Sequence, residues 1–181
     1  MKGKRRKWIE DVASRAREIA GLSTDDIIGD LESLEKIVEG FGGAIEYFSM
    51  YESYEEVVKS GDEEFTIRID SSNTETFQRF SIARELGHLF LHMRYRTKKW
   101  DEIGIGANYS RMKGAFTIFE EDASDFATAF LMPEEAFIKI ANETSDDNHY
   151  YPDKIAKHFK VSEECTNLRG RNLALWEQIK N

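Results

Sequence analysis

The sequence lacks the marks of secreted and membrane-embedded proteins. It has one cysteine, Cys165, so no disulfide can form within the chain. No apolar run approaches the roughly 20 residues that span a bilayer. The first residues are basic, without the apolar core and cleavage site of a secretory signal. These absences predict a soluble cytoplasmic protein in which Cys165 packs in the last helices as a small hydrophobic residue.

Positive charge is also scarce. The 25 Lys and Arg residues are outnumbered by 34 Asp and Glu residues, for a net charge of −9. This balance argues against a protein that coats nucleic acid or binds anionic membranes. Basic residues crowd residues 2–7, which we interpret as the solvated start of a first helix. With 40% hydrophobic and 12% aromatic residues, the chain can bury a core, as one domain or as one domain with a small appendage.

The sequence does contain a long amphipathic stretch, FQRFSIARELGHLFLH, at residues 77–92. Its apolar positions follow the spacing of a helix, and its polar positions do so too. Residues four apart lie on one face of a helix, so Arg84, His88 and His92 are predicted to form a column that Glu85 flanks. This helix is the centre of the predicted fold.

The flanking segments predict an α+β fold that is mostly helical with a small antiparallel sheet. Apolar periodicity and capping residues predict further helices at residues 8–20, 25–40, 119–132 and 134–142. Alternating apolar residues and turn residues predict strands at residues 44–50, 54–58 and 64–69. Residues 93–113 form a polar loop, longer than most connections, and such loops are usually functional or mobile.

A polar, acidic break at residues 144–148 gives the predicted domain boundary. Residues 1–145 would form the main domain, and residues 146–181 a C-terminal helical segment. Two short helical patterns in that segment resemble a helix-turn-helix. Its basic residues are offset by Glu163 and Glu164, so partner docking or packing is favoured over contact with DNA.

Two linked motifs resemble those of the ImmA/IrrE family of metallopeptidases. The family's first motif, RF-x-x-AHELGH-x-x-x-H, is matched at Arg79-Phe80, Ala83, Glu85-Leu86-Gly87-His88 and His92. Its second motif, E-x-x-A-N-x-FA-x-x-LLMP, is matched at Glu120, Ala123, Phe126-Ala127 and Leu131-Met132-Pro133. A third segment, LA-x-x-F-x-VS, agrees at residues 155–162, and the whole resemblance covers roughly residues 65–175.

The resemblance implies a zincin-like fold and a zinc endopeptidase. Such peptidases cleave a repressor-type transcription regulator and so relieve repression in a phage, a mobile element or a stress response. Carried over residue by residue, the resemblance implies Glu85 as the general base, His88 as a zinc ligand and Glu120 as the third ligand. Two positions depart from the pattern: Arg84 stands where the family has its first zinc-ligand histidine, and Ser124 where it has asparagine.

Arg84 is the departure that matters for chemistry. Zinc needs lone-pair donors, whereas a guanidinium stays protonated and has none to give. It also brings a positive charge toward the cation, which costs about 4 kcal/mol per charge pair at about 4 Å and an effective dielectric of about 20. We therefore expect an impaired zinc site, in which Arg84 takes the place of the metal and forms a bidentate ion pair with Glu120.

Other interpretations stay open. His88 and His92 are four residues apart and could hold zinc one turn along the helix, with Glu120, Glu121 or Asp122 as the oxygen ligand. Glu121 and Asp122 are better interpreted as a solvated first helical turn, to which Glu120 could also belong, although Glu120 is favoured as a site residue. The predicted function is then either a peptidase with a remodelled zinc site or a metal-free pseudopeptidase that regulates a protein partner by binding it.

Overall fold

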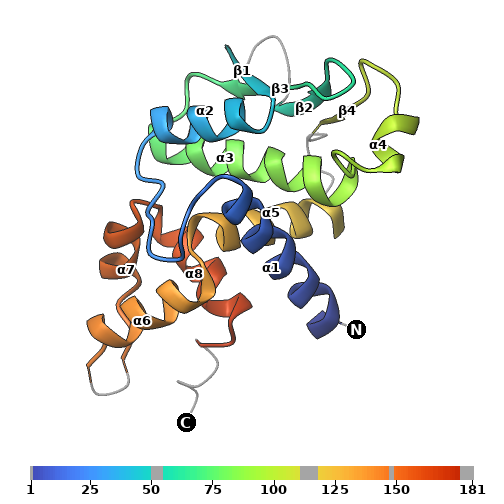
Figure 1. Cartoon of the computed structure of the whole chain (residues 1–181). Coiled ribbons are helices and arrows are strands. Elements are labelled where there is room, and N and C mark those ends of the chain that lie inside the picture. The colour runs from blue at the N-terminus through green and yellow to red at the C-terminus, as the bar shows by residue number, and fades with distance from the viewer. Residues whose placement is uncertain (1, 50–54, 111–117, 147–148, 176–181) are drawn as a thin grey trace.

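The computed structural model describes residues 2–49, 55–110, 118–146 and 149–175. It confirms the α+β class, with helices predominating over a small sheet. In chain order (Figure 1), the elements are α1 (Lys2–Ile19), α2 (Leu31–Gly40), β1 (Gly43–Phe48), β2 (Glu56–Lys59), β3 (Phe65–Asp70), α3 (Glu75–Gly87), η1 (His88–His92), α4 (Lys98–Glu102), β4 (Asn108–Ser110), α5 (Ile118–Leu131), α6 (Glu134–Thr144), α7 (Pro152–Phe159) and α8 (Glu163–Asn172).

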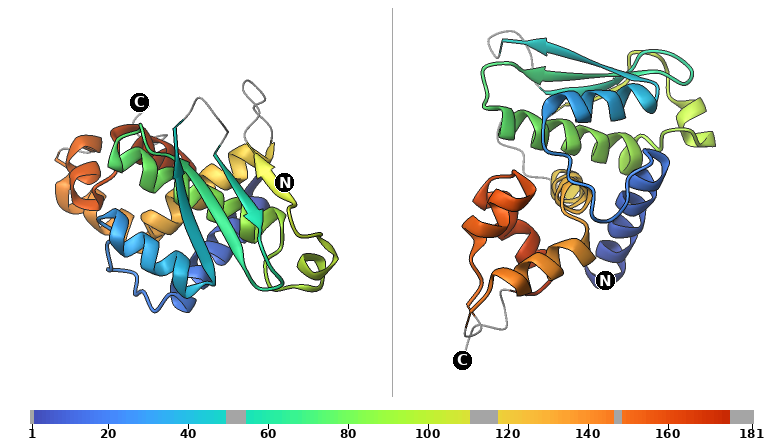
Figure 2. Two further views of the ribbon diagram at one scale, coloured as in Figure 1. Left: turned by 90° about the horizontal axis from the view of Figure 1, so that it is seen from above. Right: turned by 60° about the vertical axis from the view of Figure 1, so that its left-hand side comes forward.

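The elements stack in layers, with the sheet outermost on one side (Figure 2, right). Helices α2 and α3 pack against the sheet, and α5 packs against α3 on the side away from the sheet. Helices α1 and α8 in turn contact α5. Helices α3 and α5 therefore lie at the centre of the molecule. A central helix contacts neighbours on more than one side, so it is apolar on more than one face.

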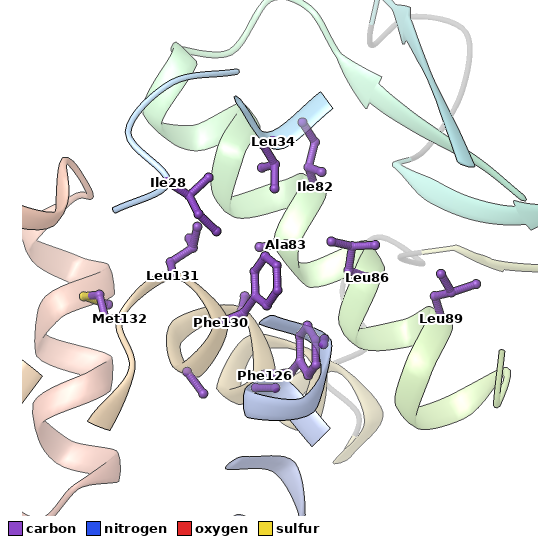
Figure 3. Close-up of a cluster of buried hydrophobic side chains, with 14 of the residues drawn as sticks. Ile28, Leu34, Ile82, Ala83, Leu86, Leu89, Phe126, Phe130, Leu131 and Met132 are labelled. Carbon is purple, nitrogen blue, oxygen red and sulfur yellow. The ribbon is translucent and has the colours of Figure 1, made fainter. Parts of the chain in front are cut away.

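The core between these two central helices is aliphatic and aromatic. Figure 3 shows Ala83 and Leu86 of α3 near Phe126 and Phe130 of α5, and all four side chains are fully buried. The helices approach closely where Gly87 meets Ala123: a Cβ built on Gly87 would lie 2.9 Å from the Ala123 backbone. Small residues at this crossing let the two helices bring their polar side chains together.

The sheet is mixed, so the predicted antiparallel arrangement is wrong in part. Its strand order is β1-β3-β2-β4, in which β1 runs parallel to β3 and the other pairs are antiparallel. Alternation within a strand indicates which side chains are buried, but it does not specify the neighbouring strand or its direction. Strand β4, inside the predicted loop, was not predicted. Part of the strand predicted at residues 54–58 and the end of that at 44–50 lie outside the described residues.

The second helix begins later than residues 25–40 predict. Helix α2 starts at Leu31, and the Asp30 side chain accepts a hydrogen bond from the Ser33 amide, 2.8 Å away. The segment from Ser23 to Asp26, which the sequence offers as the N-cap of the predicted helix, instead closes a turn. In this turn the Ser23 amide donates to the Asp26 carboxylate. Both segments offer capping residues, and only the second one begins a helix here. The first helix, α1, begins at Lys2 rather than at residue 8.

Most of the predicted loop at residues 93–113 is held in place. It contains α4 and β4, and the rings of Tyr95 and Trp100 are buried. The Tyr95 hydroxyl lies within hydrogen-bond distance of the carbonyl oxygens of Phe41 and Glu63, at 2.5 and 2.7 Å. Residues 93–110 therefore form a packed connection rather than an open lid, and residues 111–113 lie outside the described part of the chain.

The tail forms the two helices expected from its sequence, α7 and α8. Ser162 caps α8 by accepting a hydrogen bond from the Cys165 amide, and Cys165 is buried as predicted. The tail is also tied to the preceding residues, because Asn172 donates to Asp125 at 2.6 Å. The division of the chain at residue 145 stays a prediction. Of the helices that the structure describes, none is long and apolar enough to cross a membrane.

Candidate functional site

The central helix changes its winding at the predicted site. The α-helical part, α3, ends at Gly87, and residues His88–His92 form the π-helical turn η1. The Met93 amide donates to the His88 carbonyl at 3.0 Å, an i→i+5 bond that widens the turn. Such turns are rare and are frequent at functional sites. The regular helical column predicted through His92 is therefore interrupted after His88.

Arg84 is buried in α3 and binds two carboxylates. Its side chain is 3% exposed, and its Nη2 donates to Glu55 Oε2 at 2.8 Å and to Glu85 Oε1 at 3.0 Å. Glu55 directly precedes β2, so the sheet side of the molecule supplies one of the two partners. The predicted bidentate pair with Glu120 is wrong: among the hydrogen bonds of the described residues, Arg84 donates to Glu55 and Glu85 instead.

The charge balance around Arg84 favours its protonated form. Burial lowers the pKa of Arg84, but the carboxylates of Glu85 and Glu55 and the more distant charge of Glu120 outweigh it, so the pKa lies above its usual value. Carboxylates that contact a buried cation stabilise its protonated form. Arg84 therefore remains a guanidinium, which cannot ligate a metal ion.

Glu85, the predicted general base, is engaged by this cation. It is 1% exposed, and burial raises the pKa of its carboxyl while the charge of Arg84 opposes that shift. Oε1 accepts from Arg84, and within the described part of the chain Oε2 has no hydrogen-bond partner. A carboxylate so placed is held by its neighbour rather than directed at an open position where water could be activated.

His88 and Glu120, the two remaining predicted ligands, are brought together. His88 Nε2 lies 3.4 Å from Glu120 Oε1 across the interface between η1 and α5. Two ligands that bind one tetrahedral zinc at about 2.1 Å are about 3.4 Å apart, so this separation suits a shared ion. His88 is buried and Glu120 is half-buried. The pair lies as the resemblance implies for the second and third ligands, although arginine occupies the first ligand position.

The alternative zinc site one turn along is only partly assembled. The rings of His88 and His92 face each other through their Nδ1 atoms, 3.0 Å apart, and Asp122 Oδ2 lies 3.7 Å from His92 Nε2. The two carboxylates therefore face the Nε2 side of each ring, whereas the imidazoles meet on the Nδ1 side. Burial and the neighbouring His88 lower the pKa of His92 to about 4, so its ring is neutral at pH 7.

Asp122 forms an ion pair with Arg5 of the first helix. Its carboxylate is 3% exposed and accepts from Arg5 Nε at 2.6 Å and from Arg5 Nη2. The interpretation of Asp122 as a solvated first-turn acid is wrong, whereas Glu121 is exposed as that interpretation requires. The basic start of α1 is thus more than a solvated segment, because Arg5 provides the counter-charge for a buried acid next to His92.

Three other residues of the site could not be identified from the sequence. Tyr109 of β4 lies over both imidazoles, with ring centroids 5.4 Å from His88 and 5.5 Å from His92. Glu55 reaches Arg84 from 29 residues away, and Arg5 reaches Asp122 from 117 residues away. Neither Tyr109 nor these partners belong to a motif with fixed spacing, so only the tertiary fold brings them to the site.

The residues present do not fit a three-ligand zinc ion. A catalytic zinc site uses three protein ligands and one water. Here the first position holds Arg84, a fixed cation, and its two nearest carboxylates bind its guanidinium. No group of three His, Cys, Asp or Glu side chains is arranged to hold a metal ion within the ranges that the structure describes. Of the three ligand positions that the resemblance implies, two hold residues able to bind zinc, His88 and Glu120.

Comparison with known proteins agrees with this architecture. Residues 49–170, more than half of the chain, match the protein family described as IrrE N-terminal-like domain, Peptidase_M78. The match includes β2, β3 and α3, the helix α5 and most of the tail, so it contains every site residue except Arg5. A search of curated proteins finds no match. The chain belongs to the Peptidase_M78 family of IrrE N-terminal-like domains.

Proposed function

We propose that this protein uses a peptidase fold to bind a protein partner, a repressor-type transcription regulator, and that it regulates this partner without cutting it. The family supports a protein as the bound molecule. One observation carries the absence of cleavage: Arg84 stands at the first ligand position, and its buried guanidinium binds Glu85 and Glu55. The arginine thus occupies a ligand position and also neutralises the residue that would act as the base.

The physical argument is one of charge and of lone pairs. Arg84 is 3% exposed, so it cannot turn into solvent without breaking contacts with two carboxylates. A divalent ion placed on His88 and Glu120 would face this cation at short range. Each like-charge pair at about 4 Å costs about 4 kcal/mol at an effective dielectric of about 20. In this proposal the arginine supplies the positive charge that the metal supplies in a peptidase.

A zinc peptidase with a remodelled site is the second candidate. It is favoured by the 3.4 Å between His88 Nε2 and Glu120 Oε1, a separation suited to two ligands of one ion. A third ligand would then have to come from solvent or from the partner. A role as a DNA-binding protein is less favoured, because α8 begins with the acidic residues Glu163 and Glu164 and packs against α5.

Metal content tests the proposal directly. The unaltered chain, Arg84→His and Arg84→Met are purified alike, and zinc is measured per chain. Met keeps a long side chain but adds no nitrogen ligand, so it is the matched control for His. We expect stoichiometric zinc in Arg84→His only. Because Glu55 loses its partner in this variant, Arg84→His is also prepared with Glu55→Gln. Near-stoichiometric zinc in the unaltered chain contradicts the proposal.

The fate of a bound partner tests whether the protein cleaves the partner that it binds. A repressor-type regulator that co-purifies with the unaltered chain should remain at full length after long incubation with it. The same regulator should be cleaved by zinc-loaded Arg84→His and left intact by Arg84→His/Glu85→Gln, which lacks the base. Cleavage by the unaltered chain, blocked by a chelator, would favour the remodelled peptidase.

A further inference from the structure

A cavity lies away from the candidate site, at the other end of α3 from η1. It has a volume of about 440 Å³ and is formed by the first half of α3, the end of α5 and the segment from the α7–α8 turn into α8. Figure 1 shows these elements on the side of the molecule opposite α4. The volume falls within the range of about 300–1,000 Å³ that is usual for sites of small molecules.

The walls of this cavity are largely apolar. Its apolar lining includes Phe77, Phe80, Leu131, Val161 and Leu168. Leu131 is buried and belongs to the core (Figure 3), whereas Phe77 is 44% exposed. An exposed phenylalanine beside a cavity offers apolar surface that folding itself does not cover. A ligand with an apolar chain would remove that surface from water.

The cavity also contains a buried cation with an unused donor. Arg79 is 3% exposed; its Nη1 donates to the Ile28 carbonyl at 2.7 Å, and its Nη2 donates to the Lys160 carbonyl. Its Nε is buried and has no acceptor among the residues that the structure describes. Burial lowers the pKa of Arg79, and the carboxylates of Glu75 and Asp30 oppose that shift through space. A buried donor of this kind is costly to leave unpaired.

The remaining charges of the lining lie at the exposed side of the cavity. Arg171 is exposed and adds a second positive charge, and Glu164, also exposed, is the carboxylate of the lining. Within the part of the chain that the structure describes, Glu164 pairs with neither arginine, and the lining carries two positive charges against one negative charge. The combination of an apolar wall with a guanidinium donor matches a ligand that is apolar over most of its length and anionic at one end.

We propose that this cavity binds a small amphiphile, an apolar chain that bears one carboxylate. The carboxylate lies at the buried end of the cavity against the positive charge of Arg79, and Arg171 contributes a second positive charge. The chain lies along Phe77, Phe80 and Leu168. The site is separate from Arg84 and its carboxylates, so it does not depend on whether the protein cleaves, or merely binds, its partner.

Calorimetric titration of the full chain tests the chemistry of the ligand. Three probes share a ten-carbon chain and differ at the head: decanoate, decan-1-ol and decyltrimethylammonium, each used below the concentration at which it forms micelles. We expect decanoate to bind at least tenfold more tightly than either of the others. Equal binding of all three would overturn recognition of the carboxylate, and absence of decanoate binding would overturn the site altogether.

Matched variants test the location. Leu168→Trp fills the cavity and should weaken decanoate binding at least tenfold. Ile138→Trp places the same ring at a half-buried position in a different cavity, between α1 and α6, and should leave binding unchanged. Arg171→Gln should weaken decanoate two- to fivefold, as loss of an exposed charge does, and leave decan-1-ol unaffected. Unchanged decanoate binding by Leu168→Trp, with the fold intact by circular dichroism, would overturn the proposal. Arg79 is kept because it also holds two carbonyl groups.

Discussion

Arg84 Nη2 and Glu55 Oε2 lie 2.8 Å apart and join the central helix to the start of β2. The same nitrogen also contacts Glu85, its neighbour in the sequence. One of these contacts is local and the other depends on the tertiary fold. A guanidinium donates through several N–H groups in one plane, so it can hold both carboxylates at once. The cation is therefore built into the packing of α3 against the sheet.

Removal of this cation should destabilise the protein. Arg84→Met leaves Glu85 and Glu55 without their counter-charge in a buried position. We expect the free energy of unfolding to fall by about 3–5 kcal/mol, the usual loss when one member of a buried pair is removed. Urea denaturation followed by circular dichroism measures the change.

Two further variants separate the buried pair from general effects of the substitution. Arg15→Met breaks an exposed pair with Glu18 and should change the free energy of unfolding by less than about 0.5 kcal/mol. Arg84→Met/Glu55→Gln should recover part of the loss, because one buried charge is also removed. A loss below about 1 kcal/mol for Arg84→Met would mean that the pair contributes no more than a surface contact.

The pair of Arg5 with Asp122 should also contribute to stability. Asp122 is 3% exposed and loses two hydrogen-bond donors in Arg5→Met. We expect a loss of about 1–3 kcal/mol in the free energy of unfolding, as for a buried acceptor left without its partner. Lys4→Met, at the preceding exposed position, is the control and should be nearly neutral. Equal effects of the two substitutions would contradict a specific role for Arg5.

The close approach of α3 and α5 predicts that Gly87→Ala is destabilising. Gly87 has ordinary helical dihedral angles, so alanine would by itself favour the helix by about 1 kcal/mol. The added Cβ would lie 2.9 Å from the Ala123 backbone, however, and an overpacked contact costs about 1–3 kcal/mol. We expect a lower melting temperature. Gly40→Ala, where no atom lies within 4 Å, should be neutral or stabilising; a rise for both would show that the helices move apart freely.

The thiol of Cys165 should react slowly in the folded protein. Burial raises its pKa to about 12, so the thiolate is roughly 10⁻⁴ of the population at pH 8, against about a quarter for a free thiol of pKa about 8.5. Alkylation by iodoacetamide, followed by mass spectrometry, should be slow at pH 8 and become fast in urea. Cys165→Ser/Ser60→Cys, with an exposed thiol, is the control. Fast alkylation of the native chain would contradict the buried position.

The sequence predicts most of the helices and the polar residues of the central one. Apolar periodicity is strong in α3 and α5, so their positions follow from it. His88 lies beside Glu120, and the role of the two as metal ligands stays a prediction. The partner of Arg84 could not be predicted in this way. Glu120 and Glu55 are both carboxylates, and the choice between them depends on how closely β2 approaches α3, which no local pattern records.

The errors have local physical causes. Ser23 and Asp30 are both good caps, and the choice between them is made by the tertiary packing of the segment between them. Strand β4 has three residues and no alternation long enough to detect. The π-helical turn at His88 arises within a segment whose sequence is fully compatible with an α-helix, so its presence could not be read from propensities.

The contact of Glu10 with Arg169 has a consequence for the order of folding. Arg169 is fully buried, donates to the Met132 carbonyl at 2.9 Å, and binds the Glu10 carboxylate through two nitrogens, one at 2.9 Å. The two residues are 159 positions apart, so the first helix meets this partner only after the chain as far as α8 has left the ribosome. We expect nascent chains that end before α8 to hold α1 loosely against α5, and docking of α8 to be among the last steps of assembly.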